Sequence, residues 1–221
     1  ILAEYDALPG LSQKAVPYKI SNDGRGGHAC GHHLFGTAST AAAIAVKNYL
    51  KKSGKKGTIK LFGCPAEEGG SGKVYMTRAG LFDDLDVALH WHADSKNSAG
   101  IRPALANKSA KFRFYGIAAH AAGAPEMGRS ALDAVEAMNT MVNMMREHVT
   151  DDTRIHYVIT RGGEAPNVVP DFAEVYYYSR HSTRDEVIRV FDRIVDAARG
   201  AALGTGTTME YEMIGGTHEL L

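Results

Sequence analysis

The chain has 221 residues, of which 44% are hydrophobic and 23% are charged. This composition is typical of a globular protein with enough apolar material for one large domain or two small ones. Lysine plus arginine and aspartate plus glutamate number 25 each, which predicts no nucleic-acid partner. The sequence has no polybasic run, no apolar stretch of membrane-spanning length, no signal-peptide pattern and too few cysteines for a disulfide framework. We therefore expect a cytoplasmic protein with no membrane partner.

The two ends of the sequence resemble internal segments. Residues 1–3 predict the middle of a strand, and the chain stops at residues 218–221 without a closing helix. We expect a fragment, with sequence missing on both sides.

Residues 1–103 alternate helices with short apolar runs. The expected elements are a helix over residues 34–50, a buried strand over 60–64, a helix over 72–79 and a buried strand over 85–89. Strands that alternate with helices indicate a parallel sheet. We expect this half to be a partial α/β domain with a mostly parallel sheet.

Residues 104–214 predict a different architecture. A strand with alternating Phe112 and Phe114 is followed by a helix with apolar residues at three- and four-residue spacing, over residues 132–145. Two strands (153–161 and 172–180), a second helix and a last strand (209–214) complete the order βαββαβ, which is that of the ferredoxin-like motif. Thr183 and Glu186 have the spacing of a capping box at the start of the second helix. We expect residues 215–221 to return into the first domain.

Three clusters of chemically active side chains lie in the first half. Residues 26–33 hold one thiol and three imidazoles in a glycine-containing loop before a helix; residues 67–68 are adjacent glutamates after a buried strand; and His90 and His92 follow another buried strand. Sites in open α/β sheets form beyond the carboxyl ends of strands. Thiolate, imidazole and carboxylate are ligands for zinc and similar divalent ions.

Each cluster alone has an ordinary structural explanation. A thiol beside a histidine can be a packed pair, two glutamates in a loop are usually solvated, and a His-x-His can be one core and one surface residue. The three clusters together form a specific constellation. Adjacent glutamates also suit hydrolysis, because one can bind a metal while its neighbour takes a proton from water.

Five motifs occur in the order seen in the metal-dependent aminoacylase and carboxypeptidase superfamily. They are EYDALP (residues 4–9), HACGH (28–32), PAEE (65–68), AHAA (119–122) and NVVP (167–170). The chain resembles the branch of amidohydrolases that act on hippurate, indole-acetyl amino acids and p-aminobenzoyl-glutamate. Residues 30–38 are most similar to the aminobenzoyl-glutamate utilisation protein B group. The resemblance covers nearly the whole chain.

The resemblance implies a role for individual residues. It implies two divalent ions, zinc or manganese, whose ligands include Cys30, His32, Glu68 and His92. It implies that Glu67 is the general base and that Asp6 supports the site. The second domain would be a ferredoxin-like lid that dimerises, in which His120 reaches the partner's active site to stabilise the oxyanion. Asn167 and Arg180 would hold the carboxylate end of the substrate.

Some positions depart from the pattern of the superfamily. His33 stands where many relatives have Asp, and His90 competes with His92 as the third cluster's ligand. A further metal-binding histidine, expected from the C-terminal part of the catalytic domain, is not found, and His218 lies in the wrong context. The site in this chain is therefore expected to be incomplete.

The sequence as a whole predicts a hydrolase of the amide bond in an N-acyl amino acid, with an N-aroyl group such as that of p-aminobenzoyl-glutamate. A homodimer through the lid is expected, or a hetero-oligomer with a related subunit. Two alternatives stay open: a hydrolase that uses Cys30 as nucleophile with a nearby histidine, and a non-catalytic protein that binds metal and dimerises.

Overall fold

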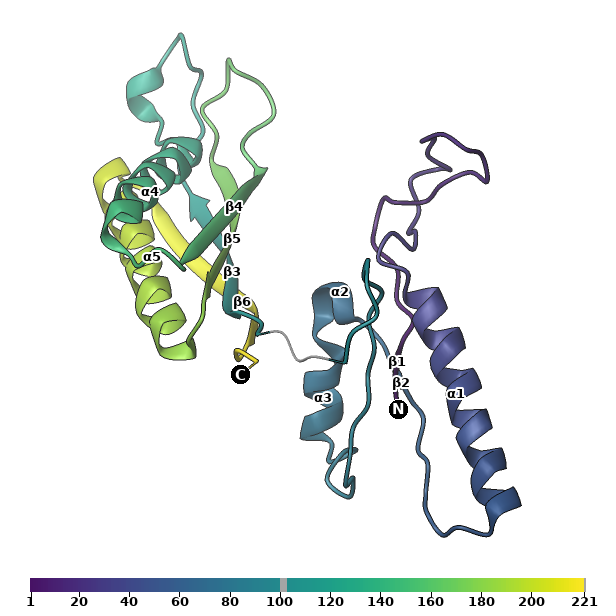
Figure 1. Ribbon diagram of the computed structural model, residues 1–221. Helices are drawn as coiled ribbons and strands as arrows, with labels where there is room; N and C mark the ends of the chain where they lie inside the picture. The colour runs from purple at the N-terminus through teal and green to yellow at the C-terminus, as the bar shows by residue number, and fades with distance from the viewer. Residues whose placement is uncertain (100–102, 221) are drawn as a thin grey trace. The chain divides into compact units, whose positions relative to one another are not determined.

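The chain folds into two units (Figure 1). The computed structural model describes residues 1–99 and 103–220. The first unit is Ile1–Ala99 and the second is Gly100–Leu221. The division falls close to the predicted boundary after residue 103. Within the described ranges, no helix has the length and apolar character needed to cross a membrane.

The first unit contains a short parallel sheet flanked by helices. Its elements are β1 (Leu2–Glu4), α1 (His32–Ser53), β2 (Phe62–Cys64), α2 (Glu67–Gly70) and α3 (Gly72–Arg78). Strands β1 and β2 pair in parallel, with Leu2 opposite Phe62 and Glu4 opposite Cys64. Because the strands are parallel, their carboxyl ends lie at the same edge, so the segments after Glu4 and Cys64 begin side by side.

Residues 85–89 are not a strand in the structure, so this prediction is wrong. The backbone N–H of Leu2 donates to the carbonyl of Leu89 at 2.9 Å, which places the segment beside β1 without a regular ladder. Val87 and Leu89 are exposed. An apolar run indicates a buried strand only where other elements cover both of its faces, and the described part of the first unit does not cover this segment.

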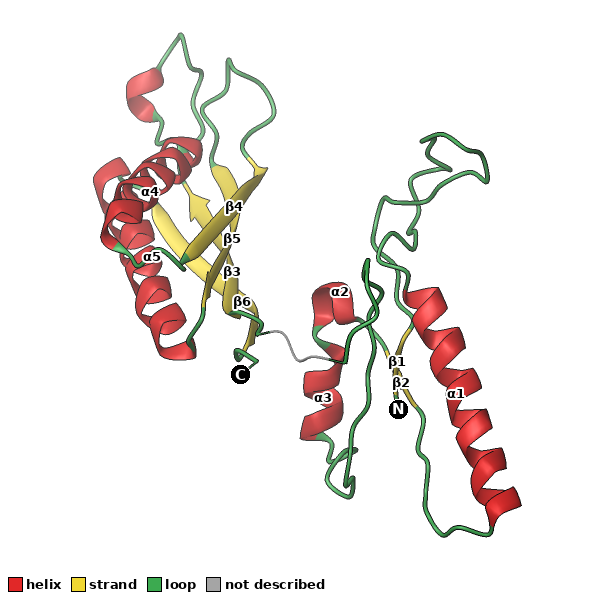
Figure 2. Cartoon of the chain, viewed as in Figure 1, coloured by secondary structure: helices red, strands yellow, loops and turns green. Residues whose placement is uncertain are grey.

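The second unit is a four-stranded antiparallel sheet with two helices on one face (Figure 2). Its main elements are β3 (Ala106–Tyr115), α4 (Ala131–Met145), β4 (Arg154–Arg161), β5 (Phe172–His181), α5 (Arg184–Thr205) and β6 (Thr208–Thr217), with short 3-10 helices η1 (Pro125–Met127) and η2 (Arg146–His148). The strand order is β4-β5-β3-β6, and all neighbours are antiparallel. This is the ferredoxin-like topology that the element order predicts.

The core of the second unit lies between the sheet and its two helices. Phe112 and Phe114 on β3 alternate with polar residues, and both are fully buried. Val175 and Tyr177 on β5 face the same core, which Val135 and other apolar residues of α4 and α5 complete. The period of two in the strands and of 3.6 in the helices therefore sets which side chains are buried.

The start of α5 and the end of β6 differ in detail from the sequence predictions. Helix α5 begins after Thr183 as expected, but the Thr183 side chain makes no capping bond. Its hydroxyl lies 3.1 Å from His181 Nδ1, and the Arg184 N–H donates instead to Glu219 Oε2 at 3.1 Å. The predicted capping box is therefore wrong, because the Thr183 N–H donates to His181 Nδ1 and the Glu186 carboxylate accepts from Arg189. Strand β6 continues to Thr217, so three residues expected to leave this domain belong to its sheet, and the return of the chain beyond them stays a prediction.

Candidate metal centre

The loop conformation before α1 presents Cys30 and His32 together. The backbone of Gly31 has a left-handed conformation, with φ 92°, which residues other than glycine rarely adopt. Helix α1 starts at His32, directly after this turn. The glycine between the thiol and the imidazole is therefore a conformational requirement of the motif.

His32 is buried and oriented by Asp6. Its side chain is 1% exposed, and its Nδ1 donates to Asp6 Oδ1 at 2.9 Å. The other carboxylate oxygen of Asp6 accepts the backbone N–H of Glu68 at 3.0 Å. With Nδ1 protonated, the lone pair of the neutral ring lies on Nε2. Such carboxylate–histidine pairs orient metal-binding imidazoles in proteins.

The Nε2 atom of His32 is buried and has no hydrogen-bond partner among the described residues. Three carboxylates surround it, with Glu4 Oε2 at 3.5 Å, Glu67 Oε2 at 3.8 Å and Glu68 Oε1 at 4.0 Å. These contacts are too long for ordinary hydrogen bonds. A buried nitrogen lone pair facing several anionic oxygens is an arrangement that a bound cation would stabilise.

Cys30 and His92 complete the constellation. Cys30 Sγ lies 3.2 Å from His92 Nε2, and His92 Nδ1 donates to the carbonyl of Ala93 at 2.8 Å. His90, the competing residue, pairs instead with Glu4 Oε2 at 3.2 Å. The structure therefore groups His92, and not His90, with the thiol, and it holds a second imidazole with its Nε2 lone pair toward that group.

The ionisation of the cluster reflects its crowded negative charge. Burial raises the pKa of Glu67, and the carboxylates of Glu4 and Glu68 raise it further. Burial also raises the pKa of the Cys30 thiol, with Glu68 adding to the effect. For Asp6, burial opposes ionisation, but the hydrogen bonds from the Glu68 N–H and His32 leave its pKa below the usual value.

The residues present fit a divalent metal ion. Donor atoms of Cys30, His32 and His92 lie within 4.8 Å of one another, as do those of His32, Glu67 and Glu68. Sulfur, nitrogen and oxygen donors in this combination suit zinc or manganese. The two groups share His32, so the predicted ligands and the predicted base form one continuous cluster.

In the second unit, His120 and Asn167 lie on neighbouring loops. His120 forms a bridge with Val168, and the Ala121 N–H donates to the Asn167 carbonyl at 3.0 Å. His120 Nδ1 accepts the backbone N–H groups of Ala122 and Gly123 at 3.2 and 3.0 Å. The proton of a neutral His120 must therefore lie on Nε2, which is free to donate.

Arg180 does not join this pair. It lies near the far end of β5, whereas Asn167 precedes the first residue of that strand, Phe172. Eight residues of strand span about 26 Å at roughly 3.3 Å per residue. Asn167 and Arg180 of one chain therefore lie far apart along the sheet, and their roles at the carboxylate end of the substrate stay predictions.

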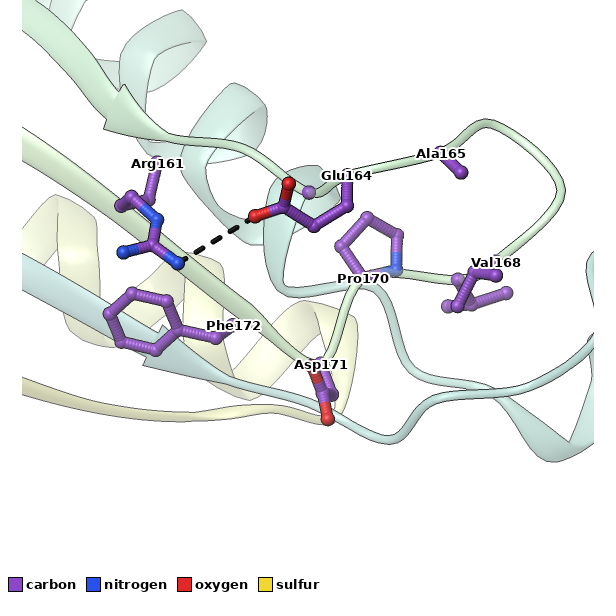
Figure 3. A pocket seen from close by; sticks show the side chains of 9 residues that line it. Arg161, Glu164, Ala165, Val168, Pro170, Asp171 and Phe172 are labelled. Carbon is purple, nitrogen blue, oxygen red and sulfur yellow. Dashed lines mark ion pairs between the residues drawn. The ribbon is translucent and has the colours of Figure 1, made fainter.

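A cavity of about 200 Å³ lies in the loop between β4 and β5 (Figure 3). Pro170 and Phe172 line it, and Arg161 pairs with Glu164 at its rim at 3.7 Å. Both charged side chains are well exposed, so this ion pair contributes little to stability. The cavity shares its loop with Asn167 but contains none of the predicted site residues.

Comparison with known proteins identifies the family. Residues 1–220 match the model of peptidase family M20/M25/M40. The chain belongs to this family.

Relatives in the M20 family agree with the motif-based resemblance. The chain is 51% identical over 214 residues to the B-type subunit of p-aminobenzoyl-glutamate hydrolase of Escherichia coli strain K12, a match that covers 95% of this chain and 44% of the relative. It is 35% identical to the Xaa-Arg dipeptidase of Mus musculus, over 96% of this chain and 46% of the relative. The chain therefore spans about half the length of these proteins.

A solved structure has a similar fold. The crystal structure of an aminobenzoyl-glutamate utilization protein from Klebsiella pneumoniae superposes with a TM-score of 0.67 at 29% identity. The match covers 85% of this chain and 49% of the other. The resemblance to the aminobenzoyl-glutamate utilisation group, inferred from the motifs, is confirmed.

Sequence reasoning missed one member of the cluster in this M20 chain. Glu4 is 3% exposed and forms ion pairs with Lys73 and His90 as well as facing His32. The sequence signal for Glu4 was a carboxylate at the end of a predicted apolar strand, two residues before Asp6. A charged side chain in such a place is seldom buried without partners, so it indicates a polar cluster nearby.

Proposed function

We propose that the protein to which this chain belongs hydrolyses the amide bond of an N-acyl amino acid, with an N-aroyl substrate such as p-aminobenzoyl-glutamate. One observation carries the proposal: the buried, unpartnered Nε2 of His32 faces thiol and carboxylate donors while Asp6 fixes its tautomer. The names of the relatives supply the substrate class, since the E. coli relative belongs to a p-aminobenzoyl-glutamate hydrolase.

In this proposal Cys30, His32, Glu68 and His92 hold two divalent ions, zinc or manganese. When bound, such ions polarise a carbonyl group and make hydroxide available near neutral pH. Asp6 keeps the His32 lone pair directed at the site. Glu4, which pairs with Lys73, also faces the Nε2 of that imidazole.

The position of Glu67 suits a general base that carries the proton during hydrolysis. Its side chain is 45% exposed while its Oε2 lies 3.8 Å from His32 Nε2, so it can contact both the site and an incoming substrate. Its raised pKa brings the carboxylate closer to the working pH of a general base. Glu67 takes a proton from water at a carboxylate oxygen and returns it to the leaving amine.

His120 and the second unit supply groups for the substrate. The Nε2–H of His120, fixed by two backbone donors to Nδ1, can donate to a developing oxyanion. We propose that the ferredoxin-like unit acts as a lid and dimerisation domain, with His120 serving the partner's site. Asn167 and Arg180 bind carboxylate groups from separate positions.

The proposal extends to the oligomeric state and the cellular location of the protein. Relatives of this chain include both of the named components of E. coli p-aminobenzoyl-glutamate hydrolase. We propose a homodimer through the lid or a hetero-oligomer with a related subunit, in the cytoplasm.

Metal analysis tests the centre directly. Elemental analysis of the purified full-length protein should find about two ions per chain, and the Cys30→Ser variant should hold fewer. In parallel, Glu67→Gln should keep its metal but lose hydrolysis of p-aminobenzoyl-glutamate. Wild-type turnover by Glu67→Gln would show that the proton carrier is misassigned.

The 3.2 Å contact between Cys30 and His92 also suits a second function, a cysteine hydrolase. Its nucleophile would be the thiolate, whereas burial and nearby carboxylates raise the pKa of this thiol. The cysteine hydrolase predicts activity that resists chelators and is lost rapidly with thiol reagents. Activity removed by a chelator and restored by zinc or manganese would reject it. A non-catalytic metal-binding dimer predicts bound metal without turnover on any N-acyl amino acid.

A further inference from the structure

The cavity in the loop between β4 and β5 has the size and the lining of a site for one aromatic ring. Its volume is about 200 Å³, and Val168, Val169, Pro170 and Phe172 supply its apolar walls. An apolar cavity of about 150 Å³ in another protein holds benzene. The side chain of Val168 is 47% exposed, so part of the apolar wall is open to an incoming ligand.

The walls of this cavity are held in place by the protein itself. The Val169 N–H donates to the Ala119 carbonyl at 3.0 Å, and the Pro170 carbonyl accepts the Ala131 N–H at 2.8 Å. On the other arm of the loop, Gly163 has φ 105°, and a Cβ atom there would lie 2.8 Å from Pro170 Cγ. Glycine therefore lets the two arms approach each other. Pockets that are largely formed before binding are typical of small-molecule sites.

The cavity adjoins the residues that would contact the carbonyl group of the substrate. Val168 forms an antiparallel bridge with His120, and Asn167 directly precedes it in the chain. Residues opposite each other in such a bridge have Cα atoms about 4.5–5.5 Å apart. In an N-aroyl amide the aromatic ring is bonded directly to the carbonyl carbon, so a group that donates to the carbonyl oxygen has the ring close by. His120 and the cavity can therefore bind adjoining parts of one acyl group.

The rim of the cavity carries a carboxylate with spare acceptor capacity. In Figure 3, Pro170 lies between Val168 on one side and the pair of Arg161 and Glu164 on the other. The Arg161 guanidinium lies 5.9 Å from the centre of the Phe172 ring, and its Nη2 lies 3.7 Å from Glu164 Oε1. That separation is too long for a hydrogen bond, and a carboxylate accepts at about four lone-pair positions. A ring over Pro170 with its acyl carbon towards Val168 has its para position towards Glu164.

We propose that this cavity binds the aromatic ring of the N-aroyl group, and that Glu164 accepts a hydrogen bond from a para-amino group on that ring. The inference rests on the proposed function for the identity of the ligand as an N-aroyl amino acid. The family resemblance gives roles to His120 and Asn167 but none to the cavity or to Glu164. The cavity then determines which acyl group the protein selects.

Calorimetric titration tests the ring site. Full-length protein with Glu67→Gln, which should keep its metal and leave the ligand uncleaved, is titrated with N-benzoyl-glutamate and with N-acetyl-glutamate. A single methylene in an apolar pocket gives roughly tenfold discrimination or more, so the benzoyl compound should bind at least tenfold more tightly. Ala165 lines the cavity, and the added ring of Ala165→Phe should reduce this preference to less than threefold. Thr140→Phe, on the exposed side of α4, should keep it.

The contribution of Glu164 is measured with a second pair of ligands. The compound p-aminobenzoyl-glutamate should bind at least threefold more tightly than N-benzoyl-glutamate. Glu164→Ala should remove this difference and leave the preference for benzoyl over acetyl intact. Glu136→Ala, an exposed glutamate of α4, should change neither ratio. Equal binding of the amino and benzoyl compounds by protein with Glu164 in place would overturn the role of Glu164.

Photochemical labelling locates the ring without any change to the cavity. Illumination of the full-length protein with bound p-azidobenzoyl-glutamate should attach the label within residues 161–172, as identified by mass spectrometry, and excess p-aminobenzoyl-glutamate should prevent it. Labelling confined to other segments, or an unchanged benzoyl preference in folded Ala165→Phe, would overturn the ring site. Labelling of this loop by a protein without hydrolytic activity would refute the proposed function and leave the ring site standing. Hydrolysis with the label elsewhere would do the reverse.

Discussion

Replacing Asp6 by Asn tests how the buried imidazole is prepared for metal. Asp6 accepts two hydrogen bonds, from His32 Nδ1 at 2.9 Å and from the Glu68 N–H at 3.0 Å. The amide of Asn has only one oxygen in this plane, so its NH₂ group must face one of the two donors. We expect one buried donor to lose its acceptor.

The expected change in metal affinity follows from the loss of this hydrogen bond. A buried donor left without an acceptor costs about 1–3 kcal/mol, which corresponds to roughly 5- to 150-fold in an equilibrium constant. Loss of the outer partner of a metal-bound histidine typically weakens metal binding by about 10- to 100-fold. We therefore expect Asp6→Asn to raise the metal dissociation constant within this range.

The assay is competition for zinc with a chromophoric chelator of known affinity. Asp84→Asn is the matched control, since Asp84 is an exposed carboxylate of the same unit that pairs with Lys60. The control should keep wild-type affinity, and circular dichroism should show that both variants are folded. Wild-type zinc affinity in folded Asp6→Asn would refute the argument that Asp6 orients His32.

Two further predictions concern backbone strain and pH. Gly31→Ala places a side chain at φ 92° and should cost about 1–2 kcal/mol of stability together with metal affinity; Gly54→Ala, at φ 66° at the other end of α1, should lose similar stability in urea unfolding and keep its metal affinity. The hydrogen bond from Ser182, together with His181, lowers the pKa of Asp152 to about 2. The stability gained from this depressed pKa is present above the ordinary pKa of aspartate and is lost as pH falls from about 5 towards 2. Unfolding temperatures measured over this range should fall less in Asp152→Asn than in the wild type, and equal slopes would contradict the assignment.

Periodicity and local motifs were sufficient to predict most elements of the fold. The alternation around Phe112 and Phe114, and the apolar spacing that includes Val135, indicated the ferredoxin-like order of the second unit. Side-chain direction along a strand or helix is a local property, so the sequence carries it directly. The same holds for the glycine between Cys30 and His32, whose conformation determines how the motif presents its donors.

Partners from distant segments could not be predicted in this way. The apolar run at residues 85–89 lacks the covering layers that a buried strand needs. At the start of α5, Thr183 and Glu186 bond to His181 and Arg189 and not to each other. The chemistry of Glu4 depends on Lys73 and His90, which no local pattern connects to it.

For the candidate site, the sequence determined the donor types and their order along the chain. Only the tertiary structure decided that His92 and not His90 meets Cys30, and that Arg180 lies at the end of β5 far from the loop that holds Asn167. The reason is physical: residue type and local spacing determine what a side chain can bind, whereas sheet register and burial determine which groups it meets and which charges stay uncompensated.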